Sequence, residues 1–255
     1  KITDNLIFNP YTMTKKLLVA AFALLAVARM ADAQTNLQTF YDFGRGYVTT
    51  TMEGFHVDNW GNTFFFIDYD YNMRDGNTII SPGNTYFEIA RCLNFWQNSK
   101  MAPLSLQLEY NGGFGHYVLG SPTDTYGAFP VNSAFLAGVD YFLHSGDFKN
   151  TLNLKFLYKH FVYGPSDDSA DKNKIPLQFT AVWGCQDLFG APGLRFSGFA
   201  DVWSEFGKVV VLSEPQLWYQ IFDHFNIGSE IELSYNFAGL KGFNVMPCLG
   251  TKWVF

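Results

Sequence analysis

One pattern dominates the chain from residue 36 onward: apolar and polar side chains alternate over stretches of about ten positions. In one stretch, Leu104, Leu106 and Leu108 alternate with polar neighbours. Clusters of Gly, Pro, Asn and Asp separate the stretches. Because successive side chains of a β-strand point to opposite faces, this period of two predicts strands with one apolar and one polar face.

The alternation predicts about twelve strands. Short connections (144–147, 186–193) contrast with longer polar ones (112–131, 163–174). Short turns at one end and long loops at the other are typical of an outer-membrane barrel, and an even number of strands places both termini at the short-turn end. We therefore predict an all-β fold, a closed antiparallel transmembrane β-barrel of about 12 strands with short periplasmic turns and longer extracellular loops. The expected strands are 36–43, 47–55, 63–72, 85–95, 104–113, 132–142, 149–161, 175–185, 194–206, 209–221, 225–237 and 243–255.

The composition excludes several other classes of protein. Of 255 residues, 48% are hydrophobic and 18% aromatic, which excludes a disordered chain. The net charge of −6 argues against a nucleic-acid partner, which needs a basic surface. The longest apolar run, residues 17–28, is too short for a membrane-spanning helix.

The N-terminal part has the features of an export signal. Residues 13–16 form a short basic segment with two lysines, residues 17–28 are apolar, and Ala31-Asp32-Ala33 supplies a small-x-small cleavage pattern. We expect an upstream segment of unknown role over 1–12, a signal peptide over 13–33 cleaved after Ala33, and an outer-membrane barrel domain over 34–255.

Two further patterns support the outer-membrane assignment. Gly250, Trp253 and Phe255 match the Gly-x-x-aromatic-x-aromatic ending that the barrel assembly machinery reads. Aromatic residues also close the apolar faces at strand ends, as girdles at the two membrane interfaces require. These are Tyr69, Tyr71, Phe95, Tyr110, Tyr141, Tyr158, Tyr219, Tyr235, Phe237 and Trp253.

In such a barrel the polar phase faces the lumen, because the apolar phase faces lipid. The lumen is then acidic on balance and favours cations and neutral polar solutes over phosphorylated ones, since charged rings in a pore select by sign. Alternatively, the inward charges form ion-pair networks that hold the wall. The inward carboxylates are Asp42, Asp68, Asp70, Glu88, Glu109, Asp140, Asp201, Glu205, Glu214, Glu230 and Glu232, and the inward bases are Lys155, Lys159, Arg195 and Lys252.

Aromatic residues share the inward phase. Rings beside carboxylates can bind flat, uncharged solutes that carry hydroxyls, because rings stack and carboxylates accept hydrogen bonds. The same rings can instead fill a narrow lumen. The inward aromatics are Phe40, Phe64, Phe66, Tyr86, Phe142, Phe161, Phe199, Trp203 and Trp218. The candidate ligand-binding residues are Phe64, Phe66, Asp68, Asp70, Glu88, Glu109, Asp140, Phe199, Asp201, Trp203, Glu230 and Glu232.

Residues 60–68 read Trp-Gly-Asn-Thr-Phe-Phe-Phe-Ile-Asp. This stretch resembles Trp-Gly-Asp-Asn-Phe-Phe-Phe-x-Asp of the nucleoside-specific channel-forming (Tsx-like) outer-membrane proteins, with Asn62 in place of Asp. Residues 86–88, 138–141 and 196–199 resemble later segments of that family in the same order, and the nearest branch is one of unknown function. The resemblance implies a monomeric twelve-stranded barrel that passes nucleosides by diffusion.

We therefore expect a passive outer-membrane channel for small polar solutes such as nucleosides, with no catalytic residue, metal or cofactor. Its expected partners are outer-membrane lipids and the barrel assembly machinery. One alternative is a lipid-acting enzyme, in which His160, at a strand end on the apolar face, is the base. Another is a soluble β-sandwich or a ligand-binding barrel without transport.

Some residues fit the barrel poorly. Arg91 falls in the apolar phase, where a lipid-facing Arg at mid-depth costs about 2–4 kcal/mol unless it reaches an interface or a bulge. Pro215 and Pro247 lie inside expected strands, where each removes a ladder donor. The three cysteines, Cys92, Cys185 and Cys248, show no metal-binding spacing and permit one disulfide or three thiols.

Overall fold

The computed structural model describes residues 34–71, 73–75, 78–81, 83–119, 125–131, 133–163, 176–205 and 207–255. The predicted segments 1–12 and 13–33, with the cleavage site, lie outside the described residues. Within the described part no helix is long and apolar enough to cross a membrane. A short 3₁₀ turn spans Leu188–Gly190.

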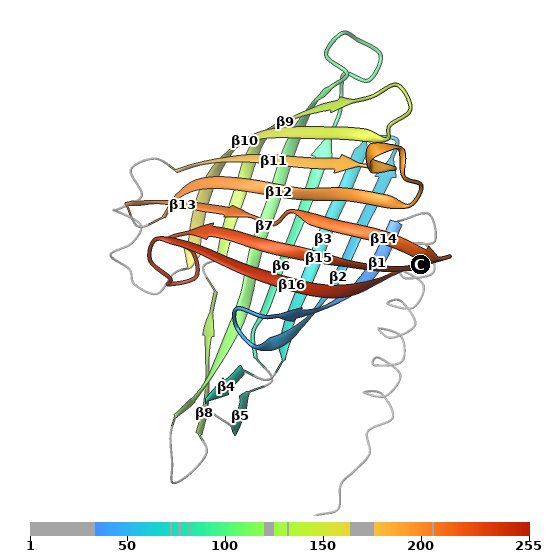
Figure 1. Cartoon of the computed structure of the whole chain (residues 1–255). Coiled ribbons are helices and arrows are strands. Elements are labelled where there is room, and N and C mark those ends of the chain that lie inside the picture. Colours follow the sequence, from blue (N-terminus) through green and yellow to red (C-terminus); the bar gives the residue numbers. More distant parts are fainter. Residues whose placement is uncertain are drawn as a thin grey trace, which may run out of the picture.

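The strands form one closed antiparallel barrel (Figure 1). Each strand pairs with its neighbours in chain order, and β1 pairs with β16 to close the wall. Two short strands, β13 and β14, share one place between β12 and β15, so the barrel has the twelve strands that the alternation predicts. The wall comprises β1 (Gln34–Asp42), β2 (Tyr47–Asp58), β3 (Gly61–Tyr71), β6 (Thr85–Leu93), β7 (Leu104–Leu119), β9 (Ser133–His144), β10 (Asn150–Tyr163), β11 (Leu177–Cys185), β12 (Leu194–Glu205), β13 (Lys208–Ser213) with β14 (Gln216–Phe222), β15 (Phe225–Tyr235) and β16 (Phe243–Val254).

The single strand expected over 209–221 is wrong in one respect, because it is interrupted at Glu214 and Pro215. Pro215 has no N–H to donate, but its carbonyl accepts from Ile231 N at 3.1 Å. Gly198 lies opposite this break with φ +152°, and a Cβ there would lie 2.5 Å from the Glu214 carbonyl oxygen. The interruption therefore needs a glycine across from it.

Pro247, by contrast, lies inside the continuous strand β16. Its carbonyl accepts from Phe43 N at 3.0 Å, one residue beyond the end of β1. In an antiparallel sheet the N–H and C=O of one residue point to the same neighbouring strand. The N–H that Pro247 lacks would therefore point toward Phe43, where β1 has already ended. The ladder therefore loses little at this proline.

The connection expected over 112–131 is also partly wrong. Strand β7 continues to Leu119 and forms a hairpin with β8 (Thr125–Pro130). The pair Gly112 and Gly113, which favours a turn in sequence, lies inside β7, and a Cβ on Gly113 would lie 2.1 Å from the Thr85 carbonyl oxygen. A second hairpin joins β4 (Met73–Asp75) to β5 (Thr78–Ser81). Both hairpins project beyond the wall at the end opposite the termini (Figure 1), while most of the connection expected over 163–174 lies outside the described residues.

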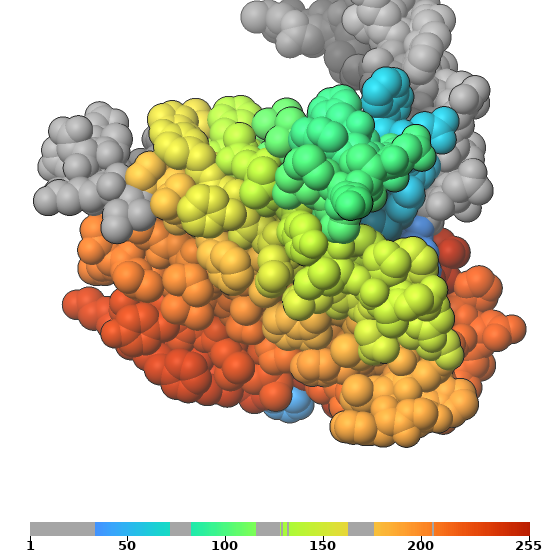
Figure 2. Space-filling model, turned by 90° about the horizontal axis from the view of Figure 1, so that it is seen from above, coloured from blue at the N-terminus to red at the C-terminus, as the bar shows by residue number. Residues whose placement is uncertain are grey.

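The two faces of the wall have opposite character. On β7, Leu108 is 57% exposed whereas Gln107 is 1% exposed, and on β10 Phe156 and Tyr158 are exposed whereas Lys159 is buried. Apart from glycines, the described buried residues comprise sixteen polar or charged and ten hydrophobic residues, so the interior is mainly polar. Figure 2 shows the outer wall over the yellow-green to red part of the chain as one continuous surface.

Aromatic rings fill part of the interior. Phe40 and Trp218 are buried with ring centroids 5.5 Å apart. They cover Gly250 and Gly228, which pair with each other across β15 and β16. A Cβ on Gly250 would lie 2.6 Å from the Phe40 ring, and one on Gly228 2.5 Å from the Trp218 ring. The glycines therefore make room for the two rings.

This packing predicts that Gly228→Ala destabilises the barrel. The new Cβ would also lie 2.3 Å from the Leu217 carbonyl oxygen, which is backbone and cannot swing away. We expect a loss of about 1–3 kcal/mol in the free energy of unfolding, as for other overpacked cores. The measurement is the urea midpoint followed by tryptophan fluorescence, with Gly146→Ala, which would meet nothing within 4 Å, as the control. Equal midpoints for the two variants would contradict this account.

Candidate functional site

The candidate site is the inner face of the barrel. The twelve candidate residues lie in the inward phase, and so do the eleven carboxylates apart from Glu214, which lies in the interruption and has no register partner among the described strands. Asp68, for example, pairs with Thr51 and Tyr86, and Asp201 pairs with Thr180. The four expected bases share this phase. Their orientation is therefore as predicted, and their contact with a solute stays a prediction.

Two inward charges escape the sequence pattern. Glu53 pairs with Phe66 and accepts a hydrogen bond from Asn36 Nδ2 at 3.0 Å, so it faces the lumen. The threonine run at 49–51 hides its phase, because Thr suits either face. Arg45 lies in the turn between β1 and β2, where no strand period applies, and its inward position depends on the tertiary structure.

Neutral donors hold most of the luminal carboxylates in place. A hydroxyl or amide donor satisfies an oxygen without cancelling the charge, so these groups keep the lumen acidic when they are ionised. The bonds are Thr51 to Asp68 (2.6 Å), Thr49 to Asp70 (2.7 Å), Tyr86 to Glu88 (2.7 Å), Gln107 to Glu109 (2.6 Å), Asn153 to Asp140 (2.8 and 3.0 Å) and Gln216 to Glu230 (2.5 Å).

Arg45 is the exception, because it pairs directly with two carboxylates at the end opposite the termini. Its Nη1 lies 2.8 Å from Asp42 Oδ2, and its Nη2 donates to Glu232 Oε2. Burial opposes the charge, but the bonds and charge of these carboxylates raise the pKa of Arg45 above its usual value. Glu232 is 5% exposed and its second oxygen has no partner in the described residues. Arg45 therefore anchors the first turn inside the mouth of the lumen.

Lys159 occupies a second acidic region. Its Nζ donates to Gln178 Oε1 at 2.8 Å and lies 4.3 Å from the centroid of the Trp203 ring. Three candidate carboxylates from other strands, Glu88, Glu109 and Asp201, act on it electrostatically. The fold thus gathers four predicted site residues around one buried amine.

Lys252 is held in a similar way, with Nζ 4.2 Å from the centroid of the Trp218 ring. Among the described residues, none of the four expected bases forms an ion pair of 4.0 Å or shorter with a carboxylate. Within the described part of the chain, these bases therefore do not form the ion-pair networks of the alternative hypothesis. Aromatic faces hold two of them instead.

The inward aromatics divide into two kinds. Phe40 and Trp218 are buried and fill space, as described above. Phe64, Phe66 and Tyr86 are only half-buried, and their rings follow one another with centroids 6.1 and 5.9 Å apart. The Tyr86 hydroxyl at the end of this row donates to Glu88, so a ring surface and a carboxylate lie side by side.

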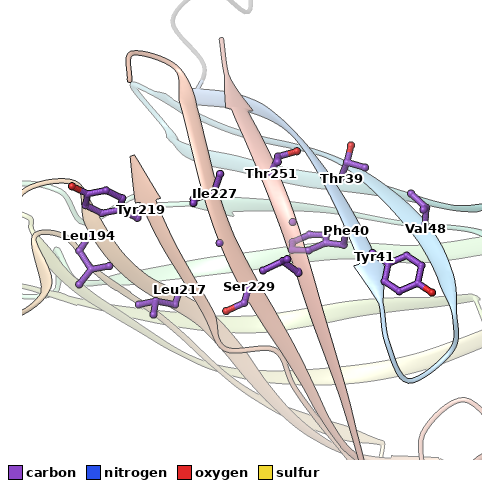
Figure 3. Close-up of a pocket in the computed structure, with 13 residues that line it drawn as sticks. Thr39, Phe40, Tyr41, Val48, Leu194, Leu217, Tyr219, Ile227, Ser229 and Thr251 are labelled. Carbon is purple, nitrogen blue, oxygen red and sulfur yellow. The ribbon is translucent and has the colours of Figure 1, made fainter. Parts of the chain in front are cut away.

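A hollow of about 640 Å³ lies elsewhere, on the outer wall (Figure 3). Its outward lining includes the hydroxyl residues Thr39, Thr251 and Ser229 between the larger Tyr41 and Tyr219. None of the twelve candidate ligand-binding residues lines it. The hollow arises where the paired glycines and small side chains thin the wall, and it is separate from the acidic lumen.

The described residues contain no group of three or more His, Cys, Asp and Glu that could hold a metal ion. The sequence permits either one disulfide or three thiols, and in the structure all three cysteines are free thiols. Cys92 and Cys248 are buried, and Cys185 is half-buried. His160 pairs with Phe135 and is exposed on the outer wall, in the apolar phase as expected.

The Arg45 contacts predict that Arg45→Gln destabilises the barrel. The change leaves the buried Glu232 carboxylate without its charged donor, and we expect a loss of about 1–3 kcal/mol in the free energy of unfolding. The measurement is the urea midpoint in lipid vesicles. Lys149→Gln is the control, because it removes an exposed 2.7 Å pair with Asp187 and should leave the midpoint unchanged. A midpoint shift as small as that of the control would contradict the prediction.

Three solved structures are similar to this chain at low sequence identity. The KdgM porin in complex with disordered oligogalacturonate is similar to this chain at 8% identity and a TM-score of 0.49, covering 88% of this chain and 99% of that one. The β domain of the Bordetella autotransporter BrkA has 9% identity, a TM-score of 0.39 and coverage of 88% and 100%. The Acinetobacter baumannii outer membrane protein Omp33 has 12% identity, a TM-score of 0.38 and coverage of 88% and 98%.

At the level of sequence, no curated protein matches the chain. A family model described as a domain of unknown function (DUF5020) matches residues 33–255. This match carries no nucleoside specificity, so the specificity implied by the Tsx-like resemblance stays a hypothesis. The chain belongs to the DUF5020 family.

Proposed function

We propose that the protein is an outer-membrane channel for the passive diffusion of small polar solutes, with a preference for cations and neutral solutes over anions. The observation that carries the proposal is the way the luminal carboxylates are held. Neutral donors hold most of them, and among the described residues the expected luminal bases form no ion pair of 4.0 Å or shorter with them. An acidic lumen of this kind attracts cations and repels anions.

The outer wall supports placement in a membrane. Its middle presents apolar side chains such as Leu108, Ile227 and Leu249, each more than 40% exposed. A soluble barrel would place such residues inside, whereas a barrel in lipid exposes them. Because the wall has no free edge, every strand can satisfy its backbone hydrogen bonds inside the bilayer.

Exposed aromatics lie near both ends of this apolar band, as interfacial girdles require. Trp60, Phe95 and Trp253 lie near the end that carries the termini, and Tyr71 and Tyr235 lie near the other end. The β4–β5 and β7–β8 hairpins extend the wall at the opposite end, so we assign the termini end to the periplasm. Phe237, an expected member of a girdle, instead packs edge-on against the inward Trp203, with centroids 6.0 Å apart.

For the finer question of solute, we propose flat, neutral molecules with hydroxyl groups, of which nucleosides are one class. The ring row of Phe64, Phe66 and Tyr86 supplies a surface for stacking, and Glu88 at its end supplies an acceptor for hydroxyls. Asp68 on the same strand lies next to this row.

The charge of the lumen predicts cation selectivity. In planar bilayers with a KCl gradient, the reversal potential should show a higher permeability for K⁺ than for Cl⁻. Replacing Glu88, Glu109 and Asp201 together with Gln, Gln and Asn should lower the permeability ratio several-fold, because three charges around Lys159 are lost. Asp187→Asn, in a turn outside the lumen, is the matched control. Anion selectivity, or folded protein without any conductance, would overturn the channel proposal.

The ring row predicts a preference for nucleosides over sugars of similar size in liposome swelling. Phe66→Leu should slow nucleoside entry several-fold and leave sugar entry unchanged, because it removes the central ring of the row. Phe156→Leu on the outer wall is the control. Equal rates for nucleosides and sugars in the unmodified protein would indicate a general pore. This result would overturn the proposed solute class but not the channel proposal.

A further inference from the structure

Arg91, which fits the apolar phase poorly in sequence, lies on the outer wall in the structure. It pairs with Thr63 on β3 and with Leu108 on β7, whose side chain is exposed. It lies two residues before the end of β6, near the turns at the termini end. Its Nη2 lies 2.8 Å from Asp58 Oδ1, and its Nη1 donates to Thr63 Oγ1 at 3.0 Å. Arg91 therefore extends along the wall toward the membrane interface.

Four polar residues form a cluster there, which we call the Arg91 cluster: His56, Asp58, Thr63 and Arg91. His56 pairs with Thr63, and Thr63 pairs with Arg91, so three of them form one row across three strands on the outward face. Trp60 lies in the turn beside the cluster, and its ring packs edge-on against Phe95. The cluster thus lies at the depth of the aromatic girdle, where lipid headgroups begin.

The cluster has unused capacity on both of its charges. The side chains of Arg91 and Asp58 are 27% and 37% exposed. A guanidinium carries five N–H donors, of which the two contacts above use two. Thr63 accepts from Arg91, so its own hydroxyl hydrogen can be donated outward. His56 Nδ1, in the same row, is buried and has no partner in the described residues.

We propose that the Arg91 cluster binds the phosphoethanolamine headgroup of a phospholipid in the periplasmic leaflet. The phosphate is held by Arg91 and the Thr63 hydroxyl, and the ammonium is held by Asp58. The charges decide between headgroups: a site for an anion alone gains nothing from a carboxylate 2.8 Å from its arginine, whereas a zwitterion matches a cation and an anion that lie side by side. The inference rests on a lipid-facing outer wall, and it does not depend on transport.

The test is retention of lipid by the purified full chain, measured by native mass spectrometry after titration with phosphatidylethanolamine or phosphatidylglycerol of the same acyl chains. We expect several-fold higher retention of phosphatidylethanolamine. Arg91→Gln should remove most of this retention. Asp58→Asn should remove the preference for ethanolamine but keep retention of phosphatidylglycerol, because the phosphate contact is intact. Lys149→Gln breaks another exposed ion pair at the same end and should change nothing.

Equal retention of the two lipids by the unmodified protein, or unchanged retention by Arg91→Gln, would overturn the proposal. Each variant is first checked for folding by its heat-modifiable migration on a gel. If Arg91→Gln does not fold, Thr63→Val, which keeps the ion pair, should still lower retention. Conductance of the same samples separates the two proposals: a selective lipid site without conductance contradicts the channel alone, and conductance without lipid selectivity contradicts the headgroup site alone.

Discussion

The pairing of β1 with β16 is the contact on which the rest of the structure depends. Seven residue pairs, from Asn36 with Val254 to Asp42 with Cys248, join the first strand to the last. This pairing removes the final free edge of the sheet, so backbone groups are satisfied within the wall and the side chains alone decide what each face contacts. A closed wall can then be apolar outside and polar inside, which an open sheet of the same sequence could not sustain in lipid.

Closure also brings side chains together that are remote in the chain. Glu88 on β6 and Asp201 on β12 come from distant parts of the wall, yet both act on Lys159. Asp68 on β3 and Glu230 on β15 are also brought within electrostatic range of each other, in this case as two like charges. Like charges repel one another, and the fold tolerates these because Thr, Gln and Tyr donors hold Asp68, Glu230 and Glu88. Such repulsion costs stability, and it leaves the negative field on which the proposed cation preference depends.

The exceptions to the pattern have local physical causes. Pro215 interrupts its strand because it lacks a donor, and Gly198 accommodates the interruption. Pro247 does not interrupt its strand, because its neighbouring strand has ended. Arg91 violates the apolar phase but lies close enough to a strand end to reach Asp58. In each case the strand period is correct, and the position of the residue along the barrel decides the outcome.

The alternation of side chains determined the number of strands and which residues share a face, because a period of two assigns every residue of a regular strand to one face. The prediction of a closed barrel with the polar face inward needed further sequence features, namely the short and long connections, the even strand number and the export signal. The alternation failed where the period is weak or absent: at Glu53 beside the threonine run, at Arg45 in a turn, and over residues 114–119, which continue β7 beyond the strand expected over 104–113. Only the tertiary structure decided which inward residues meet, that Lys159 and Lys252 lie against rings rather than carboxylates, and which rings fill the lumen. These outcomes depend on register and on the curvature of the closed wall, which bring distant strands within reach of one another, and neither is encoded in the period of a single strand.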